Sequence, residues 1–160
     1  MKQIEYLGNT VNLIYNKNAK CWVSKIEIEG NEIELEIDME LFNQDKIDWE
    51  NFEQFLIYIS KKNRLSEYVK TGINPIKEIG LAFFKNCIDE IKEWKMQFSN
   101  SIIFRGYPKI INGKEDFEFS LVYDFAETKE NVHIDGDAYA LYLVNINSRE
   151  GINGARRIQC

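Results

Sequence analysis

The stretch NPIKEIGLAFFKNCIDEIKEWKMQF, from Asn74 to Phe98, decides the expected fold. Its large apolar residues recur at steps of three or four, the period of one face of an α-helix. These residues are Ile76, Ile79, Phe83, Cys87, Ile91, Trp94 and Phe98. Asn74 is a favourable N-cap, and Pro75 suits the first helical position, where its missing N–H costs nothing. The spacing therefore predicts a long helix from Pro75 to Phe98 that packs against a large apolar surface.

Strand patterns lie on both sides of this stretch. Residues 20–29 and 32–39 predict a hairpin around Gly30–Asn31, a common two-residue turn. In its second strand apolar residues alternate with acidic ones, the period of a strand with one buried face. Further short strands are predicted at 4–7, 10–15, 102–105, 109–111, 117–125, 131–135 and 138–146, and the tail from Asn147 to Cys160 is expected to be a loop that ends in an edge strand.

Helical patterns are confined to the middle of the chain. A helix over residues 49–62 is predicted to begin after Asp48 as N-cap, and a short helix over 65–70 is expected to stop at Gly72. Strands, then helices, then strands predict an α+β fold, with an antiparallel sheet of about six to eight strands packed against two or three helices. With 160 residues and no linker or repeat, the chain is expected to form one domain, residues 1–160.

Charge and composition narrow the functional classes. The formal charge of −6 disfavours a nucleic-acid partner and permits a basic protein partner. No signal peptide and no apolar run of the ~20 residues that span a bilayer are visible, so a cytoplasmic protein is expected. The three cysteines, Cys21, Cys87 and Cys160, lie far apart without CxxC spacing. Neither a metal site nor an essential disulfide is predicted, and no cofactor is expected.

Catalytic signatures are largely missing from the sequence. GxSxG, GxGxxG and the P-loop pattern do not occur, and His133 is the single histidine. One open alternative is a small-molecule-binding protein or enzyme with a pocket between helices and sheet, using His133, Asp124 and Tyr139 as candidate groups. Arg156 and Arg157 could bind an anion together, although a solvated pair is the commoner state. The chain is therefore more readily interpreted as a binding protein than as an enzyme.

A row of acidic residues marks the predicted hairpin. We call Glu27, Glu29, Glu34, Glu36 and Asp38 the acidic ribbon. Strand alternation predicts that they share the exposed face, with only Lys25 nearby to offset their repulsion. The ribbon can be a docking surface for a basic partner. It can equally be a solvated face that discourages aggregation between sheet edges.

Several hydrophobic patterns together resemble a known group of proteins. The patterns are Trp22 with Ile26 and Ile28, the hairpin end Ile37-Asp38, the helix residues Phe52, Phe55 and Leu56, the strand Phe119 to Asp124, and the segment from Val132 to Asp137. In this order, over most of the chain, they resemble small bacterial domains, some encoded beside polymorphic toxins, that look like immunity proteins. The resemblance implies a cytoplasmic, non-enzymatic role in binding a cognate toxin, and it transfers no functional residues. The oligomeric state is not readable from it.

Overall fold

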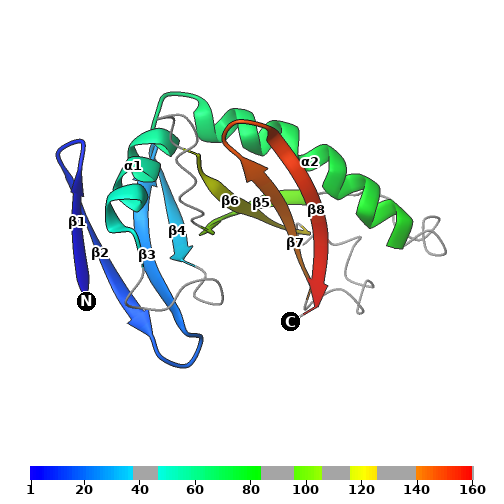
Figure 1. Ribbon diagram of the computed structural model, residues 1–160. Helices are drawn as coiled ribbons and strands as arrows, with labels where there is room; N and C mark the ends of the chain where they lie inside the picture. Colours follow the sequence, from blue (N-terminus) through cyan, green and yellow to red (C-terminus); the bar gives the residue numbers. More distant parts are fainter. Residues whose placement is uncertain (38–46, 84–95, 106–115, 126–139, 160) are drawn as a thin grey trace.

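The computed structural model describes residues 1–37, 47–83, 96–105, 116–125 and 140–159 (Figure 1). Within these ranges it contains one eight-stranded sheet and two helices, which confirms the predicted α+β class. The helices are α1 (Trp49–Ile59) and α2 (Arg64–Phe83). The strands are β1 (Lys2–Tyr6), β2 (Asn9–Asn16), β3 (Cys21–Ile28), β4 (Asn31–Ile37), β5 (Met96–Phe104), β6 (Glu118–Phe125), β7 (Ala140–Asn147) and β8 (Gly151–Gln159).

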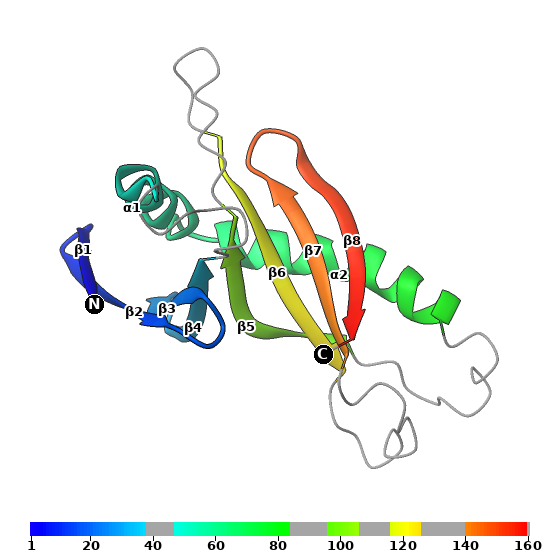
Figure 2. The same cartoon turned by 60° about the horizontal axis from the view of Figure 1, so that its bottom comes forward.

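The strands follow one another across the sheet in chain order (Figure 2). Strands β1–β4 form one antiparallel meander and β5–β8 form another. The two meanders meet at β4 and β5, which pair in parallel with Ile37 opposite Phe104. Parallel neighbours need a long crossover connection, and both helices lie in the connection between these two strands. The sheet is therefore antiparallel except at this one junction.

Two hairpin turns lie one residue earlier than predicted. Tyr6 pairs with Asn9, and Ile28 pairs with Asn31, so the turn residues are Leu7–Gly8 and Glu29–Gly30. All four turn residues have positive φ, between 46° and 79°. A two-residue turn with both φ values positive matches the twist of the flanking strands, and glycine is favoured there. Asn9 and Asn31 consequently begin strands and do not form the turns.

The predicted helix from Pro75 to Phe98 is wrong at both ends. Helix α2 begins at Arg64, so Pro75 lies within it and Gly72 does not stop it. At the other end, Met96 to Phe98 belong to β5, and Ser99 and Asn100 form a bulge in that strand before Ser101 pairs with Val122. The bulge forms where Asn100 adopts a φ of 52° and the register with β6 shifts. The predicted helical positions between residues 84 and 95 lie outside the described residues.

The C-terminal tail also differs from its prediction. Residues 151–159 are not a loop but a nine-residue strand, β8, which pairs with β7 and forms the last strand of the sheet. The expected edge strand is therefore confirmed and is longer than predicted. The predicted strands 109–111 and 131–135 lie outside the described residues.

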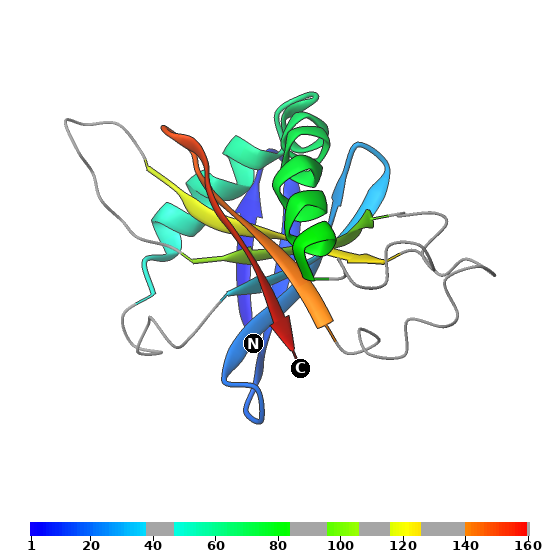
Figure 3. The ribbon, with the colours of Figure 1, turned by 90° about the vertical axis from the view of Figure 1, so that its right-hand side faces the viewer.

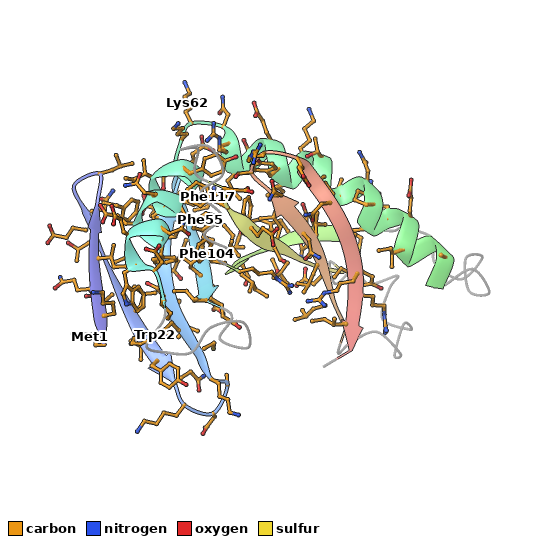
Figure 4. All side chains as sticks on the ribbon, in the orientation of Figure 1. Met1, Trp22, Phe55, Lys62, Phe104 and Phe117 are labelled. Atoms are coloured by element: carbon orange, nitrogen blue, oxygen red, sulfur yellow. The ribbon has the colours of Figure 1, made fainter. Side chains whose placement is uncertain are left out.

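Helix α1 packs against both meanders through an aromatic core, in which Trp49 contacts Trp22 of β3 and Phe55 contacts Phe104 of β5. Asp48 caps the helix as predicted, because its side chain accepts the Asn51 N–H at 2.9 Å. Phe55 is fully buried, and its ring centroid lies 4.5 Å from that of Phe104 and 5.3 Å from that of Phe119. Figure 4 shows Phe55, Phe104 and Phe117 together between α1 and the sheet. Stacked and tilted ring pairs at these distances add to the burial of apolar area.

Helix α2 packs on the same face of the second meander. The buried Tyr123 of β6 donates its hydroxyl to the Val69 carbonyl of α2 at 2.7 Å. A Cβ atom on Gly72 would lie 2.6 Å from this hydroxyl oxygen and 3.5 Å from Val144 Cγ1. Gly72 therefore lets the helix backbone approach the sheet, which explains why a glycine stands inside a helix where it costs propensity.

Candidate protein-binding face

The register of β3 and β4 gives this hairpin two unlike faces. On one face Trp22, Ile26 and Leu35 are buried beneath the helices. On the other face Val23 lies opposite Glu36, Lys25 opposite Glu34, and Glu27 opposite Glu32. We call Glu27, Glu32, Glu34 and Glu36 the acidic face. Three of them are exposed and Glu36 is half-buried. Of the predicted ribbon, Glu27 and Glu34 are therefore exposed on the side that faces away from the core, as strand alternation predicts.

The structure brings together only part of the predicted acidic ribbon. Glu27, Glu34 and Glu36 share the acidic face, and Glu32 joins them although the ribbon omitted it. The same alternation along β4 could have identified Glu32. Glu29 leaves the ribbon because it occupies the turn at a φ of 50°. Asp38 lies outside the described residues.

Glu29 connects the hairpin turn to the start of α2. Its carboxylate accepts the backbone N–H of Asn63, the residue that precedes the first residue of α2. The Asn63 carbonyl in turn accepts the Glu67 N–H at 3.0 Å, which starts the helix. A carboxylate at a helix N-terminus is favoured by the helix dipole. This contact joins residues 34 positions apart, and no local pattern in the sequence indicates it.

The electrostatics of the acidic face are unbalanced. Glu27 and Glu32 are directly opposed, an arrangement in which like charges repel. Lys25 offsets this in part, because its ammonium donates to Glu32 Oε1 at 2.7 Å. The hydrogen bond and the negative charge of Glu32 raise the pKa of Lys25. Both side chains are about two-thirds exposed, at 65% and 68%, so solvent screens this pair and it contributes little stability.

An aliphatic patch borders the acidic face. Ile14 of β2 is 61% exposed and lies opposite Val23, which in turn lies opposite Glu36. The three residues therefore occupy one row across β2, β3 and β4. Protein-binding surfaces commonly combine an apolar centre with a charged rim. The predictions from the sequence omitted Ile14, although the buried positions Val11 and Leu13 place it on the opposite face of β2.

The structure describes only one of the three candidate groups of the alternative function, Asp124, His133 and Tyr139, and does not place it in a pocket between the helices and the sheet. Tyr123 faces α2, so the next residue, Asp124, projects from the opposite face of β6. Asp124 therefore does not line the interface of helices and sheet, which corrects its predicted placement. His133 and Tyr139 lie outside the described residues. Among the residues that are described, no group of three or more His, Cys, Asp or Glu side chains could hold a metal ion.

Asp124 is nevertheless an unusual carboxyl group. One of its oxygens, Oδ1, is buried and has no hydrogen-bond partner among the described residues. Burial raises its pKa above the ordinary value of 3.8, while a hydrogen bond from Gln97 on β5 opposes the rise. Folding therefore disfavours the charged form, so the folded state binds this proton more tightly than the unfolded chain does.

Replacing Asp124 by Asn should stabilise the protein near pH 7. In the wild-type protein, stability should fall as pH rises from about 3.8 through the raised folded-state pKa, and remain lower above it. The Asn side chain does not titrate. The difference in stability between the variant and the wild type should therefore shrink towards acid pH and be smallest below about pH 3, where Asp124 itself is neutral. Thermal melts at both pH values check this. An equal difference between variant and wild type at the two pH values would contradict the assigned effect of burial.

No helix in the described part of the chain is long and apolar enough to cross a membrane. No protein-family model, curated protein or solved structure matches the chain.

Proposed function

We propose that the chain is a non-enzymatic protein-binding domain and that its acidic face binds a basic protein. The observation that carries this proposal is the exposed cluster of Glu27, Glu32 and Glu34 around the single ammonium of Lys25, with Glu27 directly opposite Glu32. Like charges in direct opposition work against folding, so stability alone would favour mixed charge at these positions. A basic partner would relieve the repulsion, and the exposed Ile14 beside it offers an apolar contact.

The partner that fits this surface best is a basic bacterial toxin, such as a nuclease-like enzyme, which the chain would neutralise in the cytoplasm as an immunity protein. A nuclease must attract a polyanion, so its active-site surface is positively charged. The acidic face is negatively charged, as a nucleic acid is, so it can bind the positively charged surface of the nuclease and cover it. Opposite charges also speed the encounter, which favours rapid capture of a newly made toxin.

Neutralising two carboxylates of the acidic face should separate binding from stability. In the variant Glu27→Gln/Glu34→Gln we expect an unchanged or higher melting temperature, because repulsion is reduced. The binding partner to test is the protein encoded by the gene that adjoins the gene of this chain, since some of the domains that it resembles are encoded beside toxins. The rate of association with this protein should fall about three- to tenfold at low salt and depend less on ionic strength. Stopped-flow or surface-plasmon-resonance kinetics at two salt concentrations measure both effects.

The matched control changes the same net charge elsewhere. Glu50 on α1 and Glu78 on α2 are exposed and lie on the helices, which cover the opposite face of the sheet, so Glu50→Gln/Glu78→Gln should keep the wild-type association rate within about a factor of two. Equal rates for both double variants would show that only net charge matters, and the acidic face would then be a solvated surface. Failure of the co-expressed chain to protect cells from the adjoining gene's product would contradict the immunity role itself.

A further inference from the structure

We infer that the open edge of β8 is a second binding site, which takes an extended, acidic peptide strand by adding it to the sheet. Strand β8 pairs with β7 along one side, and no described strand pairs with its other side. In Figure 3 it lies at the front, at the end of the sheet. The inference goes beyond the proposed function, because it concerns other residues, a ligand of opposite charge and a different mode of recognition.

The two ends of the sheet differ in how well they are protected against strand addition. The first strand, β1, has five residues and carries charges of both signs, Lys2 and Glu5. Short length and mixed charge are common ways of blocking an edge. The last strand, β8, has nine residues, longer than an average strand, and contains no proline. Its register with β7 shifts at Asn153, and residues 154–159 then pair with β7 without interruption. This second part of β8 presents a regular row of backbone N–H and C=O groups at the edge, which is the requirement for strand addition.

The charge of β8 selects the kind of strand that fits. The chain carries a net charge of −6, yet three of its five arginines, Arg149, Arg156 and Arg157, lie within its last twelve residues. Strand β8 itself contains no acidic residue. Arg156 lies opposite the buried Leu143, and Arg157 lies opposite Tyr142, which faces the helices. Arg157 is therefore on the face that the helices cover, and the exposed Arg156 is on the opposite face, where it can meet an added strand.

These features favour an acidic strand over a second copy of the chain. Antiparallel pairing of two β8 edges would bring arginines from both copies together, with no acidic residue on either strand to offset them. A strand in which glutamate alternates with aliphatic residues supplies the complementary charge. Its backbone would extend the hydrogen-bond ladder of β7 and β8, and its carboxylates would meet the guanidinium group of Arg156.

The test uses a fluorescent peptide of the sequence GNEIELEI, which is that of residues 30–37 of this chain and alternates glutamate with aliphatic residues. Fluorescence anisotropy at low salt measures its binding to the protein. We expect saturable binding to the full-length wild-type protein. The variant Arg156→Glu should weaken binding by at least about tenfold, since it replaces an attraction by a repulsion. Arg156 is exposed, so this variant should keep the wild-type melting temperature. Lys17→Glu, the same charge change in the turn between β2 and β3, should alter binding less than about twofold.

Methylated peptides distinguish strand addition from charge attraction without altering the protein. Backbone N–H groups of successive strand residues point to opposite edges, so only alternate amides of the peptide can pair with β8. One peptide carries N-methyl groups on its glutamates, and the other carries them on its isoleucines and leucine. A strand that is added antiparallel to β8, with its glutamates on the face of Arg156, can pair through only one of its edges. One methylated peptide should therefore lose binding and the other should keep it. No saturable binding of the unmodified peptide, equal binding to Arg156→Glu, equal behaviour of both methylated peptides, or a β8-dependent dimer in light scattering would each overturn the inference.

Discussion

Replacing Gly72 by Ala should destabilise the protein by about 1–3 kcal/mol, the range for overpacking a filled core. Helix propensity alone predicts the opposite sign, because Ala is favoured over Gly inside a helix by about 1 kcal/mol. The contact with Tyr123 decides between them: the new Cβ would lie 2.6 Å from the tyrosine hydroxyl oxygen. Tyr123 is fully buried, and its hydroxyl is held by Val69, so the ring cannot swing away cheaply.

A double-mutant cycle isolates this contact. Tyr123→Phe alone removes one hydrogen bond and should cost about 1 kcal/mol. In that background the atoms nearest to the new Cβ are Tyr123 Cζ at 3.4 Å and Val144 Cγ1 at 3.5 Å, both ordinary van der Waals distances. Gly72→Ala should therefore become neutral or stabilising there, which gives a coupling energy of at least about 1 kcal/mol. Thr71→Ala, at the exposed neighbouring position, is the control and should stay within about 0.5 kcal/mol. Urea unfolding measures all variants, and a Gly72→Ala protein more stable than the wild type would refute the close approach of α2.

The largest loss of stability is expected from Phe55→Ala, at about 3–5 kcal/mol. Phe55 is fully buried, and its ring contacts those of Phe104, Phe117 and Phe119 at centroid distances between 4.5 and 5.8 Å. Removing the ring leaves a cavity between α1 and both meanders, since Phe104 lies on β5, where the meanders join.

An exposed branched residue provides the control for Phe55→Ala. Ile14→Thr keeps a β-branched side chain in β2 and removes apolar surface that is already 61% exposed, so it should change stability by less than about 0.5 kcal/mol. Unfolding free energies from urea titration compare the two variants. A loss below about 1 kcal/mol for Phe55→Ala would mean that α1 does not hold the aromatic core.

The sequence predicts those elements whose signals are local. Alternation along 32–37 identified β4 and its acidic side, and Asp48 identified the start of α1, because both depend on residues within one element. The boundary of α2 could not be predicted in the same way. Gly72 and Pro75 are helix breakers by propensity, and the contact of Gly72 with Tyr123 joins residues 51 positions apart.

The same distinction holds for the candidate site. The acidic face follows from strand period, whereas the departure of Glu29 to the start of α2 depends on tertiary packing. No local pattern predicts the parallel pairing of β4 with β5, because about sixty residues separate the two strands and only the assembled sheet brings them together. For Met96 to Phe98, apolar spacing fits either a helix or a strand, and pairing with β6 decides the outcome.

Carboxylate footprinting of the complex is the most direct test of whether the acidic face binds the partner. The chain is labelled with carbodiimide and glycine ethyl ester, alone and bound to the product of the adjoining gene, and each glutamate is read by mass spectrometry. We expect Glu27, Glu32 and Glu34 to become protected, while the exposed Glu50 and Glu78 on the two helices label as before. Protection of Glu50 or Glu78 with the acidic face still labelled would place the partner elsewhere and contradict the proposal.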